Sequence, residues 1–221
     1  MFDKMFKFSN QLALFVSSGS VRADELSYLV RSKMEVGEFE PMLIPEQPGM
    51  PAEIPRLHIN TDSGYRLAMS KSRIDLTVEI PFGIMQEEED RFSKNCAILM
   101  SILRERKIDF DRVGWVGSWF AEVDNAGSAL ASSLLKVADR EVSDMNVSIT
   151  QKKNINDITC NSLFSFANGT HQSGMQGIIV ARDVNTVPSN GMVITCDQAD
   201  TLIFSFAKEA SKQSVLDFLE A

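Results

Sequence analysis

The residues of this chain that are able to do chemistry are few and widely spaced. Asp109 and Asp111 lie two positions apart, and in a strand they would share a face, where two carboxylates could hold Mg²⁺ for a nuclease or phosphotransfer reaction. No histidine stands beside this pair. Acids on an exposed strand are also common without any metal, so a metal-dependent enzyme is kept as an alternative hypothesis.

A nucleophilic mechanism would need one of the 2 histidines, His58 or His171. His58 lies in the strand-like sequence RLHIN, on the face opposite Leu57 and Ile59, where an imidazole that faces solvent is expected. His171 lies in the loop sequence NGTHQSG, and loops on rigid scaffolds often carry functional residues. No GxSxG, GxGxxG or GxxxxGK[ST] sequence is present. The sequence therefore predicts no catalytic residue.

The 3 cysteines, Cys96, Cys160 and Cys196, are far apart in the chain. A zinc site or a dithiol redox centre needs closely spaced thiols, so no metal and no cofactor is predicted. Scattered thiols in odd number are typical of a reducing compartment. The apolar run LALFV near the N-terminus is too short for a secretory signal, so we expect a cytoplasmic protein.

The charge of the chain argues against two classes of partner. The net charge is −8 and the sequence pI is about 4.9, whereas a general nucleic-acid binder needs a basic surface. The basic groups are small and local: Arg104, Arg106, Lys107, Lys152 and Lys153. No run approaches the roughly 18 apolar residues that span a bilayer. Neither nucleic acid nor a membrane is expected as a partner.

The elements that must position these residues are clearest between positions 56 and 107. Three strand-like segments, RLHIN, YRLAM and IDLTVEI, follow one another, and the last has an apolar residue at every second position. Residues 86–107 change to a helical period, with acids in the first turn and bases in the last. A meander followed by a one-sided helix predicts an α+β fold, with mainly antiparallel sheet and helices packed on one side.

Further elements are predicted on both sides of this stretch. Helices are expected at 24–33, at 128–141 and from about 200 to the end; strands are expected at 12–18, 108–123, 145–152, 158–167, 176–184 and 192–196. Gly114 and Gly117 would permit a bulge or a close backbone approach in the strand at 108–123.

The order of elements suggests how the chain is divided. Residues 41–55 hold five of the 7 prolines, so an extended connector is predicted, with a proline-rich ligand for an aromatic groove as the alternative. Strand, helix, strands, helix occurs twice. We therefore predict one α+β unit over 1–221 that consists of two similar halves, 1–107 and 108–221.

One resemblance follows from this order of segments. The run TDSGYRLAMSKSRIDLTV, the helix with an acidic start, RVGW and IIVARDVNTV together resemble a sporadically distributed bacterial family of uncharacterised α+β proteins. RVGW stands where that family has an RYIN-like strand. The resemblance implies paired α+β halves and a bacterial cytoplasmic origin, and it brings no catalytic residues with it.

The remaining feature is a surplus of residues suited to interfaces. The chain has 11 methionines and 14 phenylalanines, and both tryptophans, Trp115 and Trp119, lie in one strand. Such residues fill cores, and they are also enriched at binding surfaces. We therefore predict a non-enzymatic interaction component, either a subunit, an inhibitor or an antitoxin-like partner, that binds a protein or its own copy. Trp115 and Trp119 are the predicted contact residues, and a small-molecule sensor is the second alternative.

Overall fold

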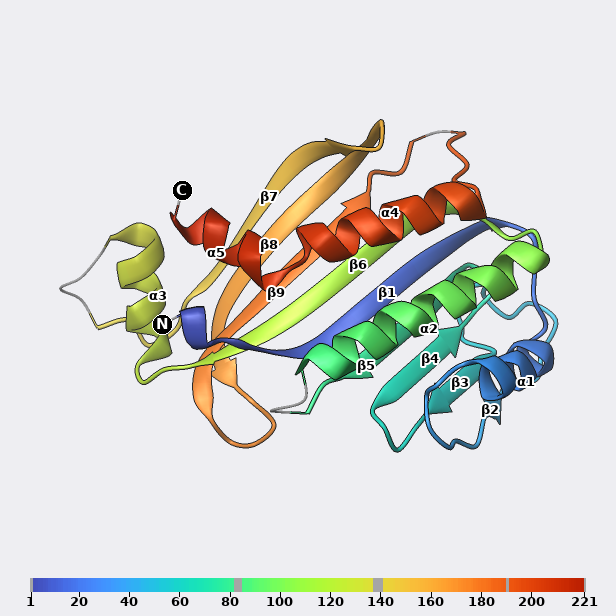
Figure 1. Cartoon of the computed structure of the whole chain (residues 1–221), viewed down its shortest axis with the longest axis horizontal. Coiled ribbons are helices and arrows are strands. Elements are labelled where there is room, and N and C mark those ends of the chain that lie inside the picture. Colours follow the sequence, from blue (N-terminus) through green and yellow to red (C-terminus); the bar gives the residue numbers. More distant parts are fainter. Residues whose placement is uncertain (1, 82–84, 137–140, 190, 221) are drawn as a thin grey trace.

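The computed structural model describes residues 2–81, 85–136, 141–189 and 191–220. They form one nine-stranded antiparallel sheet in the order β2-β3-β4-β5-β1-β6-β9-β8-β7, shown in Figure 1. The strands are β1 (Phe6–Ser18), β2 (Met42–Leu43), β3 (Leu57–Asn60), β4 (Tyr65–Met69), β5 (Arg73–Glu79), β6 (Asp109–Glu122), β7 (Asn146–Ile155), β8 (Ile158–Thr170) and β9 (Gln176–Thr186). The helices are α1 (Ala23–Lys33), α2 (Met85–Glu105), α3 (Ala126–Leu135), α4 (Cys196–Glu209) and α5 (Lys212–Glu220), after a short 3-10 turn at Phe2–Lys4.

The helices cover a single face of this sheet. In β5 the residues Ile74, Leu76 and Val78 are buried and alternate with half-buried polar ones, as the two-residue period predicts. One core cluster joins this face to α1, α2 and α4, and a second cluster joins the same face to α3 and α5 around Trp119. Figure 1 shows α2, α4 and α5 lying across that face. The predicted α+β fold with a mainly antiparallel sheet is confirmed.

The centre of the sheet joins distant parts of the chain. β1 pairs with β6, and the register places Ala13 opposite Gly114. On one side of this pair lie the other strands of residues 1–107, and on the other side lie β9, β8 and β7. Each side follows the order strand, helix, strands, helix. Whether the two halves are a true repeat stays a prediction.

Several boundaries differ from those predicted, for local reasons. β1 begins at Phe6 instead of residue 12, because Lys7 is accommodated by an ion pair with Glu89 (2.8 Å) and by the ring of Trp119. The helix expected at 128–141 ends at Leu135, and residues 137–140 of that prediction lie outside the described residues. The predicted C-terminal helix is two helices, since the chain turns at Ala210.

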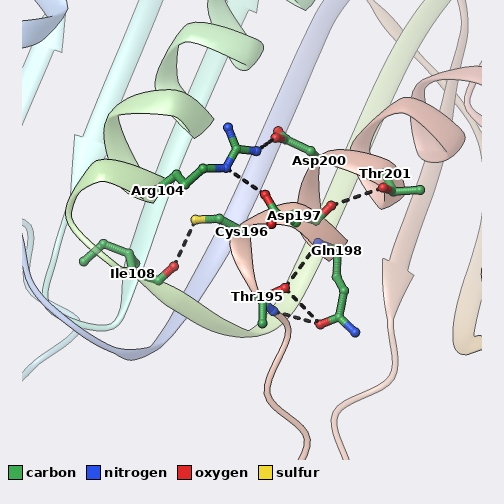
Figure 2. Close-up of polar contacts among 8 residues, drawn as sticks. All are labelled: Arg104, Ile108, Thr195, Cys196, Asp197, Gln198, Asp200 and Thr201. Carbon is green, nitrogen blue, oxygen red and sulfur yellow. Dashed lines mark hydrogen bonds and ion pairs between the residues drawn. The ribbon is translucent and has the colours of Figure 1, made fainter.

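The strand predicted at 192–196 is wrong. Only a single bridge forms there, between Ile194 and Phe110, and Thr195 instead caps α4. Figure 2 shows this cap, in which the Thr195 hydroxyl accepts a hydrogen bond from the Gln198 backbone N–H (3.3 Å). Serine and threonine favour this position because their oxygen satisfies an N–H that the first helical turn leaves unpaired.

Residues 41–55 contain the two paired residues of β2, a turn at Pro48–Gly49 and a turn at Ala52–Glu53, and their role as a connector stays a prediction. Among the described residues, no helix is both long enough and apolar enough to cross a bilayer.

Candidate functional site

The most extensive feature without an internal partner is the sheet face opposite the helices. We call it the open face. It carries the side chains that alternate with the core, among them Gln11, Ala13, Val116, Ala181 and Asp183. Most of its residues are only partly buried, although the sheet is central to the fold. A face of this kind is solvated in many antiparallel sheets, and it is also the surface available to a partner.

The open face has low relief across its centre. The strand register brings Ser9, Ser118, Ala181, Ser165 and Ser148 into one row across five strands. All five side chains of this row are short. Another molecule can therefore approach the backbone closely along this row.

Most charges on the first half of the open face are neutralised within the chain. Arg66 pairs with Glu79 (2.6 Å), and Arg73 pairs with Asp75 (2.7 Å). The amide of Gln11 also donates to Asp75 (3.0 Å). These contacts pair four charged side chains of β4 and β5 with one another.

Two charges of the open face, on β6 and β9, lie outside these ion pairs. Arg112 stacks on the ring of Phe15, with 5.0 Å from its guanidinium carbon to the ring centroid, and its Nε has no hydrogen-bond partner. Asp183 accepts one hydrogen bond, from Asn185 (2.8 Å). Within the described part of the chain, neither Arg112 nor Asp183 takes part in an ion pair. Arg112 and Asp183 are thus a cation and an anion that an external partner can neutralise. Lys152 of β7 and Glu122 of β6 are further exposed charges on the same face.

His171 borders the open face from the β8–β9 hairpin. Its ring lies 5.4 Å from Phe6, 5.9 Å from Phe8 and 5.3 Å from Phe120 between centroids. Its Nδ1 lies 2.9 Å from the Ser173 hydroxyl. These contacts explain why Phe120, which points to the open face, is fully buried. The Ser173 hydroxyl, two positions along the same loop, is the only hydroxyl or thiol in these contacts, and the three aromatic neighbours give the imidazole a packing role.

The two predicted contact residues lie in the core. Trp119 is 1% exposed beneath α5, and Trp115 is 3% exposed at the floor of a narrow groove of about 150 Å³ between α2 and α4. The burial has a simple cause: both residues lie on the helix-facing side of β6, and they share that side because they are four positions apart. Neither indole ring is exposed, so neither is available on the surface for the contact predicted for it.

The other candidates for chemistry are separated from one another. Asp109 accepts a hydrogen bond from Ser18 (3.4 Å), whereas Asp111 is exposed. Among the described residues, no three His, Cys, Asp or Glu side chains converge as metal ligands would. His58 lies on the open face of β3, as its position opposite Leu57 predicts.

The cysteines are buried and held apart as free thiols. Burial raises the pKa of Cys160 and Cys196 to about 11, and it also raises the pKa of Cys96. Cys196 donates to the Ile108 carbonyl (3.0 Å), as Figure 2 shows. A neutral thiol is a poor nucleophile, so none of the three has the environment of a reactive cysteine.

The short basic and acidic runs serve the helix layer. Arg104 links the end of α2 to the start of α4 by donating to Asp197 (2.8 Å) and to Asp200, as Figure 2 shows. Arg106 pairs with Glu25, and Lys153 pairs with Glu209 (2.7 Å).

In the acidic run at 87–90, Glu88 pairs with Arg91 and Glu89 pairs with Lys7. The charges of Glu88 and Glu89 are therefore neutralised inside the molecule.

A cavity of about 790 Å³ lies at the end of the sheet where β1 turns into α1. Its wall includes Arg56, which is buried to 6% exposure. Sequence reasoning did not single out Arg56, Arg112 or Asp183. Alternation along QGIIVARDV is a signal that would have placed Asp183 on the face opposite the core, but no sequence pattern shows that a charge lacks a partner.

Comparison of the chain with protein-family models, with curated proteins and with solved structures finds no match. No residue role is therefore carried over from another protein.

Proposed function

We propose that this protein is a non-enzymatic interaction component that pairs with a second copy of itself through the open face. The observation that carries the proposal is a helix-free face of a nine-stranded sheet with two unpaired charges of opposite sign. A two-fold interface is self-complementary, so residue i of one copy meets residue j of the other, and j meets i. Arg112 of one copy and Asp183 of the other then neutralise each other twice.

The area of the open face is sufficient for such a pair. Nine strands about 4.8 Å apart make the sheet about 38 Å wide, and its long strands, at about 3.3 Å per residue, give it a comparable length. Even with an irregular outline, the face is on the order of 1,000 Å², which exceeds the roughly 800 Å² per partner of a standard interface. The Ser and Ala row lets the two sheets approach closely, since it presents few long side chains that must be ordered.

Charge reversal tests the proposal. Molar mass in solution is measured by light scattering across a dilution series for the unaltered chain, Arg112→Glu, Asp183→Arg and the double variant. In a two-fold interface each single reversal creates two like-charge contacts, and we expect the dimer Kd to rise by about a hundredfold or more. The double variant restores opposite charges at both contacts and should dimerise again.

Lys208→Glu is the matched control, because it reverses an exposed charge on α4 in the helix layer. A monomer at all concentrations would refute the proposal, and so would a dimer that both single reversals leave intact. A chain that is monomeric alone but captures a different protein through Asp183 and Arg112 would assign the open face to that partner instead.

A further inference from the structure

The cavity beside α1 has the size and the mixed lining of a small-molecule site. It measures about 790 Å³, within the range of roughly 300–1,000 Å³ that is usual for ligand pockets. Apolar side chains from four separate segments form much of its wall: Val16, Leu43, Ile74 and Ile108. Ser20 and Ser70 add hydroxyl groups. The cavity is lined by residues 16–74 and by Ile108, and its buried wall residues Ile74 and Ile108 belong to the helix-covered core, so it is separate from the open face.

Among the charged residues that line the cavity, one cation has no ion-pair partner within the described part of the chain. Arg22 pairs with Asp24 (2.6 Å), and Lys71 pairs with Glu46. Arg56 remains. Its two terminal nitrogens donate only to backbone carbonyls, of Ile54 and Pro51, and it forms no ion pair with the residues that the structure describes.

Burial makes this surplus charge important. Arg56 is 6% exposed, whereas a guanidinium normally keeps contact with water or with a carboxylate. Glu46 of the cavity wall is already paired with Lys71: the pKa of Glu46 is lowered mainly by its hydrogen bond with Lys71, and only in smaller part by the charge of Arg56. A monoanion bound in the cavity would neutralise the remaining positive charge of its wall, which comes from Arg56.

The mouth of the cavity is partly apolar, and this favours a ligand that has an apolar part. The proline-rich connector contributes Leu43, a large apolar side chain that is 45% exposed. Leu43 lines the cavity itself. Exposed apolar side chains beside a concave, partly apolar wall are stabilised when an apolar ligand covers them.

We infer that this cavity binds an amphipathic monocarboxylate, with the carboxylate directed toward Arg56 and an apolar chain along Val16, Ile74 and Leu43. The ligand class follows from the single unbalanced cation and from the apolar wall. A neutral alcohol of the same length would leave the guanidinium unpaired, and an amine would repel it.

Calorimetric titration with decanoate, decanol and decyltrimethylammonium tests the inference. We expect saturable 1:1 binding of decanoate and affinity about tenfold or more lower for decanol, because a hydrogen bond to a charged group contributes about 1.5–3 kcal/mol. Arg56→Met should remove this preference and leave the affinity for decanol nearly unchanged.

Arg56 also holds the connector, so a second variant keeps the test independent of its structural role. Ser20→Trp places an indole at the cavity wall from an exposed position and should abolish decanoate binding. Ser17→Trp is the matched control, since Ser17 is exposed nearby but does not line the cavity. Equal affinity for decanoate and decanol, or full binding by Ser20→Trp, would overturn the inference, whether or not the chain forms dimers.

Discussion

Gly117 and Gly114 offer a direct test of the two-layer architecture, because they lie three positions apart in β6 and face opposite sides of the sheet. A Cβ on Gly117 would lie 2.7 Å from Cη2 of Trp119 and 3.1 Å from the carbonyl oxygen of Ala210. A Cβ on Gly114 would meet Asn185 Cβ at 3.3 Å, on the open face, where a side chain can move outward. Neither glycine has a positive φ, so alanine is compatible with both backbones.

The expected difference between the two alanine variants follows from these contacts. Overpacking a core costs about 1–3 kcal/mol, whereas replacing a compatible glycine by alanine gains about 0.4–1 kcal/mol. Gly117→Ala should therefore lower the free energy of unfolding by about 1–2 kcal/mol, and Gly114→Ala should change it by less than about 0.5 kcal/mol.

Urea unfolding followed by far-UV circular dichroism measures both variants, and in thermal melts about 1 kcal/mol corresponds to roughly 2–4 °C for a chain of this size. Each curve is recorded at two protein concentrations, so that any effect of Gly114→Ala on self-association is separated from its effect on the fold. Equal stability of the two variants would show that Gly117 does not face a packed helix layer, and it would refute the assignment of the open face.

Three further outcomes are expected. Thr195→Ala removes the cap of α4 and should cost about 1 kcal/mol in urea unfolding, and an unchanged midpoint would contradict the capping role. Glu209→Gln removes the carboxylate that lies 3.5 Å from the fully buried Arg182. Because Glu209 is partly exposed, we expect the free energy of unfolding to fall by only about 1–2 kcal/mol. A double-mutant cycle with Arg182→Met should show that the two residues are coupled. Burial raises the pKa of Cys160 and Cys196 from 9.0 to about 11, so their contribution to stability is present below pH 9 and is lost as the pH rises toward 11. The thiolate absorbance of the native protein should therefore stay low until about pH 11. A thiolate signal from the native protein at about pH 9 would refute the burial.

The sequence predicts the type of most elements because the periods are long and regular. The alternation in IDLTVEI and the helical period of 86–107 each reappear as β5 and α2, with ends that differ by a few residues at most. The fold class follows from these elements. The exception at 192–196 is instructive, since MVITC has strand propensity but its threonine also begins a helix, and the capping contact wins.

The candidate site is much less accessible to sequence reasoning. The sequence gives no direct sign that Trp115 and Trp119 face the helices, because a strand period states that two residues share a face but does not state which face is covered. The importance of Arg56, Arg112 and Asp183 comes from partners that they lack, and partners are set by tertiary contacts. Asn156 and Asp157 form a two-residue turn, and both have positive φ. Asparagine and aspartate favour such turns, so these two residue types indicate the β7–β8 hairpin.

The pairing of β1 with β6 also sets an order of events during synthesis. The edge of β1 that receives β6 stays open while about a hundred further residues are translated, at about 5–20 residues per second. For several seconds, the edge of β1 that will receive β6 is therefore unpaired in the nascent first half, and an unpaired strand edge is a template for non-native pairing. Because contacts of such large sequence separation form slowly, completion of the sheet should limit the folding rate, and a chain released before β6 emerges would need a chaperone to shield that edge.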